Sequence, residues 1–536
     1  MGAITVADRL LQACAATGVE TVFGLPGVHN LAFWKVSGPG RPRIVGVRHE
    51  QTTVYAADGM ARLTGGLGVA LTTTGPGAAN AVGAFGEAAA AKSPVVLIAS
   101  EVPAAYALRG QLRGLLHESR DQAGIFEPLA KAVYRPRTPE EAAAAMGDAI
   151  AAALSWPRGP VYLDVPTDVL SQPGPAVEVP AWSAPPPDGA AIDAAVAEIA
   201  AAGRIVLWVG GGATQSGAHD EVAALATRLD APVITTYGAR GILDPAHPCA
   251  VGLPPHEPAV ASLVADADLL MAIGTDFDGM MTRNWRMPRP PSLVSINVSQ
   301  HDLVKNFEPT VGVVGDAGAV LQALLGRLPE RPPTVAAELV RLRDHVWADL
   351  APEGGAAFVK LVEPLVEDVP VIVDMAIPGY WLGGYMAVSA PRFLQYPVGW
   401  GTLGYALPAS VGTAAAAKGP VLAVCGDGGV MFGLGELATL VQEQLPVTLL
   451  IVDDGGYGML RFDQDHAGDE RRGVELVRPD FAALARSFGI EAVTVDAIGA
   501  GLQGALQAAL GSGEPRVIVL ECSMKPPRTT SPRWFE

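Results

Sequence analysis

The chain has 536 residues, of which 49% are hydrophobic, so it is long enough for about three domains and too apolar for a disordered protein. Its formal charge of −18 at pH 7 argues against a nucleic-acid partner and an anionic membrane surface, and no apolar run is long enough to span a bilayer. The four cysteines are scattered without metal-ligand spacing, which favours thiols over a metal site, and we expect a cytoplasmic protein.

The first predicted elements are a strand and a helix. They come after a glycine-containing loop, residues 22–27, that includes Pro26. Residues 43–50 form the strand, which ends in the carboxylate of Glu50, and an alanine-rich helix follows over residues 51–64. The dipole of that helix alone would favour an acidic residue at its start, so Glu50 has a structural explanation as well as a chemical one.

Two histidines are candidates for chemistry. His29 lies in the loop after Gly27, and His117 stands next to Glu118 further along the chain. An imidazole near a reacting carbon can donate a proton or activate water, whereas a loop histidine that caps a turn takes no part in chemistry. Both interpretations stay open for each histidine.

Proline-rich stretches divide the chain, the first over residues 173–187 and the second at Arg331-Pro332-Pro333. Between them strands and helices alternate, which predicts a parallel sheet with helices on both faces. The glycines at 210–212 lack a full dinucleotide fingerprint and favour a tight structural turn. We expect an α/β protein with a first domain over 1–170, a linker over 171–189, a central domain over 190–330, a linker over 331–350 and a C-terminal domain over 351–536.

The most informative motif lies in the C-terminal domain, where two apolar strands each end in aspartate and glycine. Residues 422–425 lead into Gly426-Asp427-Gly428-Gly429, and residues 447–452 lead into Asp453-Asp454-Gly455-Gly456-Tyr457. Glycines let the backbone approach an anion, and carboxylates at strand ends can hold the Mg²⁺ that neutralises phosphates. The pattern predicts a Mg²⁺-diphosphate site, although the first glycine motif by itself also fits an ordinary turn.

The order and spacing of these motifs resemble thiamine diphosphate (ThDP) enzymes of the acetolactate synthase-like branch along most of the chain. The resemblance implies a pyrimidine-binding, a central and a diphosphate-binding domain, each with a doubly wound parallel sheet. It implies that Glu50 protonates the aminopyrimidine ring and so activates the cofactor. It also implies that the Gly401 carbonyl binds this ring and that Leu403 wedges the cofactor into a bent shape.

The resemblance assigns the metal ligands and further cofactor contacts. Mg²⁺ would take side-chain oxygens from Asp427 and Asp454 and the backbone carbonyl of Gly456. Aspartate replaces the family's asparagine at position 454, which adds a negative charge beside the diphosphate. The other cofactor contacts that the resemblance implies are Pro26, Gly426, Gly428, Gly429, Tyr457, Gly458 and Met459.

Several departures from the family bear on cofactor and substrate. Asp276 stands where acetolactate synthases carry a basic residue for FAD, and a carboxylate would repel a flavin diphosphate, so we expect no FAD. Asp463 replaces a tryptophan that would select an aliphatic acceptor, which implies a different acceptor. Residues 463–472 are polar and predict a flexible loop over the cofactor.

The resemblance therefore implies a ThDP- and Mg²⁺-dependent enzyme that breaks or forms a C–C bond on a 2-oxo acid or related dicarbonyl, with an acetolactate synthase-like reaction as the first expectation. The alternatives are a simple 2-oxo acid decarboxylase, a diketone hydrolase in which His29 activates water, and a non-catalytic regulatory subunit. Because the family brings Glu50 and Asp427 together from different subunits, it implies a homodimer or homotetramer.

Overall fold

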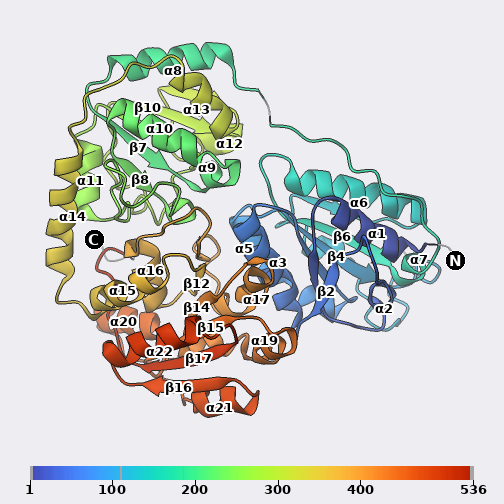
Figure 1. Ribbon diagram of the computed structural model, residues 1–536. Coiled ribbons are helices and arrows are strands. Elements are labelled where there is room, and N and C mark those ends of the chain that lie inside the picture. The colour runs from blue at the N-terminus through green and yellow to red at the C-terminus, as the bar shows by residue number, and fades with distance from the viewer. Residues whose placement is uncertain (1–3, 109–110, 185, 531–536) are drawn as a thin grey trace.

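Three parallel β-sheets with flanking helices make up the molecule. The computed structural model describes residues 4–108, 111–184 and 186–530 (Figure 1). The sheets follow one another along the chain and appear in the blue, green and orange-to-red parts of Figure 1. The predicted α/β fold with three doubly wound parallel sheets is confirmed.

The first sheet has the strand order β2-β1-β3-β4-β6-β5. Its strands are β1 (Thr21–Gly24), β2 (Arg43–Gly46), β3 (Gly68–Thr72), β4 (Val95–Glu101), β5 (Ala132–Tyr134) and β6 (Val161–Pro166). Its helices are α1 (Val6–Ala16), α2 (Leu31–Trp34), α3 (Glu50–Thr64), α4 (Pro76–Ala79), α5 (Val82–Ala90), η1 (Ala123–Ile125), α6 (Pro139–Leu154) and α7 (Thr167–Leu170). Because β1 pairs in parallel with both β2 and β3, the carboxyl ends of all three strands lie at one edge.

The second sheet has the strand order β11-β10-β9-β7-β8. Its strands are β7 (Ile205–Val209), β8 (Val233–Thr235), β9 (Leu269–Ile273), β10 (Ser292–Asn297) and β11 (Val311–Val314). Its helices are α8 (Gly189–Ala201), α9 (Gly211–Ser216), α10 (His219–Leu229), η2 (Tyr237–Ala239), α11 (Pro258–Ala265), α12 (Gln300–Val304) and α13 (Ala317–Leu325). Of the two predicted linkers, the described residues 174–184 form neither helix nor strand, whereas residues 331–350 contain α14 (Ala336–Leu350). The domain boundaries stay a prediction.

The third sheet has the strand order β13-β12-β14-β15-β17-β16. Its strands are β12 (Val371–Val373), β13 (Leu394–Gln395), β14 (Val421–Gly426), β15 (Val447–Asp453), β16 (Glu491–Val495) and β17 (Arg516–Glu521). Its helices are α15 (Gly354–Val362), η3 (Glu363–Leu365), α16 (Ile377–Tyr385), α17 (Ala406–Ala416), α18 (Asp427–Val430), η4 (Leu434–Glu436), α19 (Leu437–Glu443), α20 (Gly458–Ala467), α21 (Phe481–Ser487) and α22 (Ala500–Leu510). The strands β14 and β15 are parallel neighbours, so Asp427 and Asp454 leave the sheet at the same edge.

The predicted flexible loop over residues 463–472 is wrong in its first half. Residues 463–467 are the end of α20, and Gly468, with a φ of 75°, ends that helix in the left-handed conformation. No residue of α20 is fully buried, so the helix lacks the apolar stripe from which a helix is usually predicted.

Helices α3 and α17 join the first domain to the third. They are packed so closely that a Cβ atom on Gly412 would overlap the carbonyl oxygen of Ala56, and one on Gly59 would overlap the carbonyl oxygen of Ala409. Glycine at both positions lets the two helix backbones approach each other. Residues of both domains therefore share one apolar core.

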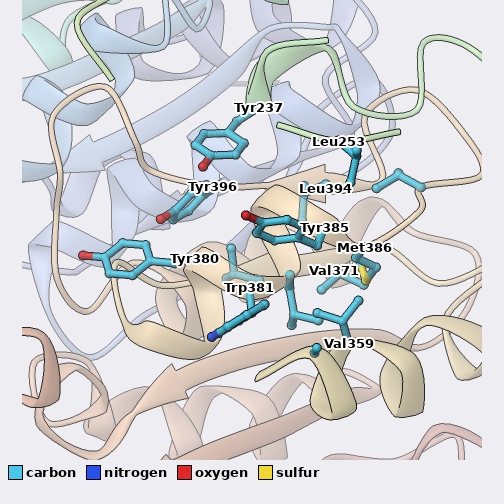
Figure 2. Packing of buried hydrophobic residues seen from close by; sticks show 14 of the residues in the cluster. Tyr237, Leu253, Val359, Val371, Tyr380, Trp381, Tyr385, Met386, Leu394 and Tyr396 are labelled. Carbon is cyan, nitrogen blue, oxygen red and sulfur yellow. The ribbon is translucent and has the colours of Figure 1, made fainter. Parts of the chain in front are cut away.

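A cluster of aromatic residues joins the central domain to the third domain. Figure 2 shows Tyr237 of the central domain beside Tyr396, with Tyr380, Trp381 and Tyr385 close by. The ring centroids of Tyr237 and Tyr396 are 5.2 Å apart, in an edge-to-face arrangement. All three domains thus pack on one another. No helix in the described parts of the chain is long and apolar enough to cross a membrane.

Candidate active site

The carboxyl-terminal edge of the first sheet brings three predicted site segments together. Glu50 is the first residue of α3, and its Oε2 accepts a hydrogen bond from Asn80 Nδ2 at 3.0 Å. A Cβ atom on Gly77 would lie 3.4 Å from Glu50 Oε1, and one on Gly27 would lie 2.6 Å from the Thr73 side chain. The segments that follow β1, β2 and β3 are therefore in contact, and glycine is required where they approach most closely.

The turn after β1 is held by Asn30, which is fully buried. Asn30 Oδ1 accepts the N–H of Gly27 at 2.9 Å, and Asn30 Nδ2 donates to the Leu25 carbonyl at 2.9 Å. Pro26 is exposed in this turn, and His29 directly precedes Asn30. Asn30 is not among the residues predicted from the sequence, although asparagine is a frequent turn-forming residue.

His29 and His117 are in contact with each other. Their ring centroids are 5.4 Å apart and their planes are inclined by 71°. The Nδ1 atom of each ring is buried and has no hydrogen-bond partner. Burial, and then the positive charge of His117, lowers the pKa of His29 below its ordinary value of 6.5.

His117 is also held close to the turn that contacts Glu50. A Cβ atom on Gly75 would lie 2.5 Å from the His117 carbonyl oxygen, and Gly75 is two residues before Gly77. His117 has a φ of 64°, a left-handed conformation that costs a non-glycine residue about 1–3 kcal/mol. Such strain is typical of functional sites, and the imidazole pair and Glu50 flank the same turn.

A cavity of about 240 Å³ lies at the carboxyl-terminal edge of the third sheet. Its lining contains most of the cofactor and metal residues that the sequence analysis singled out: Gly401, Leu403, Gly426, Asp427, Gly428, Gly429, Asp454, Gly456, Tyr457, Gly458 and Met459. Among the described residues, none of residues 1–170 lines it. Glu50, Pro26, His29 and His117 are therefore outside the cavity that Asp427 of the same chain lines.

Two carboxylates face this cavity. Burial, together with the charges of Asp454 and Asp453, raises the pKa of Asp427 to about 7. Burial also raises the pKa of Asp454, against the opposing effect of Arg461. Arg461 forms an ion pair with Asp454, with Nη2 2.9 Å from Oδ1. Buried carboxylates that repel each other are suited to share a cation.

Asp374 fixes the segment that carries Gly401 and Leu403. It is fully buried at the end of β12, and its two oxygens accept the N–H groups of Gly404 and Tyr405, both at 3.0 Å. Burial raises the pKa of Asp374 to about 6. Asp374 is not among the predicted site residues, although it is a single carboxylate directly after an apolar strand.

Thr402 ties the same segment to the first domain. Its hydroxyl donates to Glu87 Oε2 at 3.0 Å, and Arg62 Nη2 lies 2.8 Å from Glu87 Oε1. Arg62 also pairs with Asp58 at 2.8 Å, so one guanidinium serves two buried carboxylates. Leu403, which follows Thr402, is 37% exposed and lines the cavity.

Comparison with known proteins identifies the family. Three family models match the chain: the N-terminal TPP binding domain of thiamine pyrophosphate enzymes over residues 4–125, their central domain over 192–324, and their C-terminal TPP binding domain over 375–520. The chain belongs to the ThDP-dependent enzymes. The predicted resemblance to the acetolactate synthase-like branch is confirmed.

Curated relatives of this ThDP enzyme carry two kinds of name. A probable 2-ketoarginine decarboxylase of Pseudomonas aeruginosa is 34% identical over 502 residues, which span 91% of this chain and 88% of the relative. An acetolactate synthase large subunit of Parasynechococcus marenigrum is 32% identical over 522 residues, or 92% of this chain and 83% of the relative. A probable acetolactate synthase large subunit of Methanocaldococcus jannaschii is 30% identical over 520 residues, or 91% and 86%. The chain is thus an enzyme of carboligase or lyase type.

The cavity residues fit ThDP and Mg²⁺. A side chain at position 458 would overlap Asp454 Oδ2, and one at position 428 would lie 2.6 Å from the Tyr457 ring, so backbone rather than side chains faces the cavity there. Exposed backbone suits a diphosphate, and the two buried carboxylates of Asp427 and Asp454, which line the same cavity and repel each other, suit a hard cation. The individual ligand assignments stay predictions.

A second, larger cavity of about 620 Å³ lies between the three domains. Gly210, Gly211 and Gly212 line it together with Asp276. A side chain on Gly212 would come within 2.9 Å of Gly274, which gives this glycine run a packing role. Lys305 forms an ion pair with Asp276, so the carboxylate that argued against FAD is neutralised. The absence of FAD stays a prediction.

Proposed function

We propose that this ThDP enzyme is a Mg²⁺-dependent 2-oxo acid decarboxylase in which His29 and His117 deliver the proton that replaces the departing carboxylate. The observation that carries the proposal is the contact between the two imidazoles, each with an unsatisfied buried Nδ1, beside the turn that touches Glu50. When bound, ThDP supplies a nucleophilic carbon and accepts the electron pair that departing CO₂ leaves behind.

The residues of the chain would then act in two groups, one around the cavity of the third domain and one around Glu50 of the first domain. The side chains of Asp427 and Asp454 and the carbonyl of Gly456 would hold Mg²⁺, and the backbone around Gly428 would bind the diphosphate. Leu403 would pack against the cofactor at the cavity wall. The carboxylate of Glu50 would hold the proton that is exchanged with the pyrimidine ring.

A second copy of the chain completes the site in this proposal. The cavity contains no described residue of 1–170, so the Glu50 that serves it has to come from elsewhere. Apolar side chains beside the two half-sites are about half exposed, among them Trp400, Met431, Phe432 and Val28. Covering them in a two-fold homodimer, or in a tetramer built from it, would bury both half-sites together. All four cysteines are free thiols, in keeping with a cytoplasmic location.

Carboligation is the second candidate, because relatives at 32% and 30% identity are named acetolactate synthases.

The residue that follows the cavity lining on α20 bears on the substrate. Asp463 lies one helical turn after Met459, which lines the cavity, so a carboxylate and not an aromatic ring occupies that position. That carboxylate favours a substrate with a cationic end, and 2-ketoarginine, which the P. aeruginosa relative is named for, has one.

The test starts from metal-free, cofactor-free protein titrated with ThDP with and without Mg²⁺ in a calorimeter. The reloaded enzyme then receives 2-ketoarginine, an uncharged aliphatic 2-oxo acid or pyruvate, and CO₂, aldehyde and acetolactate are measured. CO₂ with an equal amount of aldehyde supports the decarboxylase, and acetolactate from pyruvate supports the carboligase. Absence of Mg²⁺-dependent ThDP binding would refute both and favour the regulatory subunit.

A further inference from the structure

A buried carboxylate of the third domain holds the backbone next to Glu50. Glu436, at the end of η4, is 1% exposed. Its Oε1 accepts the N–H of Arg48 at 3.0 Å and the N–H of His49 at 3.1 Å. Its Oε2 accepts the hydroxyl of Thr439 at 2.6 Å. A charged group this deeply buried is costly unless its oxygens are satisfied, and here the first domain supplies two of the three donors.

These two N–H groups directly precede the activating carboxylate. Helix α3 begins at Glu50, and His49 is its N-cap residue. The first N–H groups of a helix have no partner within it, and the side chain of His49 accepts only the N–H of Gln51, at 3.2 Å. Glu436 thus fixes the chain direction at the residue before Glu50, while the rest of α3 is held by its close packing against α17.

A second bond joins the same two segments. Gln51 Nε2 donates to the carbonyl of Phe432 at 2.6 Å. Phe432 comes two residues after α18, the short helix that contains Gly428 and Gly429 of the diphosphate cavity. Within one chain, the segment from α18 to Glu436 therefore runs from the cofactor cavity directly to the start of α3.

We propose that Glu436 is a positioning residue for Glu50 and that it links the diphosphate cavity of each chain to the Glu50 of the same chain. The inference rests on the proposed function, in which that Glu50 serves the cavity of the partner. Each chain would then contact both sites of a dimer through one continuous set of bonds.

The test compares Glu436→Met with Glu436→Gln by the rate at which the C2 proton of bound ThDP exchanges with deuterium, measured by quenched-flow NMR. Methionine keeps the length of the side chain but leaves both N–H groups without an acceptor. We expect exchange to slow on the order of 10- to 100-fold, because displacements of about 1 Å have such effects on catalytic groups. The ThDP dissociation constant should change by less than about threefold, since Glu436 does not line the cavity.

Glutamine is the rescuing variant. Its amide oxygen can accept the N–H groups of Arg48 and His49 in place of Oε1, and its NH₂ can donate to the Thr439 hydroxyl, so exchange should stay within about threefold of wild type. A matched control is Glu257→Met, which removes a carboxylate that accepts the Tyr385 hydroxyl at 2.9 Å in a different domain contact. It should lower thermal stability and leave the exchange rate unchanged.

The outcomes separate the inference from the proposed function. If Glu50→Gln stops exchange while Glu436→Met leaves it at the wild-type rate, the positioning role is wrong and the proposed function stands. If Glu50→Gln itself leaves exchange unchanged, the role of Glu50 fails. If Glu436→Met does not fold, Glu436→Asp tests the same role, because the shorter side chain keeps the charge but draws its oxygens away from the N–H groups of Arg48 and His49. An unchanged exchange rate in that variant would overturn the inference.

Discussion

The contact between His29 and His117 has a measurable electrostatic consequence. The pKa of His29 is lowered first by burial and then by the charge of His117, so replacing His117 by glutamine should raise the pKa of His29 towards 6.5 without reaching it, because burial remains. NMR titration of ¹³C-labelled histidine, with His29→Gln to assign the signal among the nine histidines, measures the shift. A pKa that does not move would show that the rings are not in contact in solution.

The same shift sets the sign of a stability effect. In the folded state His29 stays neutral at a pH where the unfolded chain, with its ordinary pKa of 6.5, already takes up a proton. The unfolded state therefore binds more protons just below pH 6.5, and acidification through that window destabilises the fold. His29→Gln should flatten this part of the stability profile.

Some residues of the candidate site could be predicted from the sequence, and others could not. Glycine and aspartate motifs at the ends of apolar strands predicted the cavity lining around Asp427 and Asp454, because strand order brings such ends together. The roles of Asp374 and Glu436 were not predicted. Each carboxylate accepts backbone N–H groups that are distant in the sequence, and the sequence around an isolated carboxylate does not indicate which groups it binds.

At the scale of elements, replacing a glycine at the crossing of α3 and α17 by a residue with a side chain should destabilise the protein. Gly412→Ala places a methyl group into the Ala56 carbonyl, which we expect to lower the free energy of unfolding by about 1–3 kcal/mol. The loss should appear as a lower midpoint of the first calorimetric transition. Gly419→Ala is the matched control, since nothing lies within 4 Å of a Cβ atom there, and equal losses in both variants would contradict the close crossing.

Elements with a strong apolar pattern were predicted, and those without one were not. Helix α3 agrees with the helix predicted over residues 51–64 to within one residue, because it is buried over most of its length. The strand predicted over residues 43–50 is shorter than expected, since β2 ends at Gly46 and only one of its residues is buried. Helix α20 has no buried residue and is held instead by ion pairs such as Arg461 with Asp454 and Arg471 with Asp465. Ion pairs of this kind do not produce a periodic pattern of apolar residues in the sequence.

At the scale of the whole molecule, a site shared between two chains predicts complementation. Glu50→Gln and Asp427→Ala should each abolish turnover, because each removes one half of every site. Mixed in equal amounts and reassembled at random, half of the dimers contain both variants, and each of these has one intact site and one doubly altered site. Activity should therefore return to about a quarter of wild type. Continued inactivity of the mixture, with mixed dimers verified by mass spectrometry, would place both residues in one chain's site.

The core shared by α3 and α17 also constrains how the chain folds as it is made. Ala56 of α3 is fully buried, and α17 lies directly against it, since a Cβ atom on Gly412 would overlap the Ala56 carbonyl oxygen. Domains generally fold in order of synthesis, so this face of α3 stays uncovered on the ribosome until α17 has been made. We therefore expect the first domain to be less stable when it is produced without α17 than it is in the full chain.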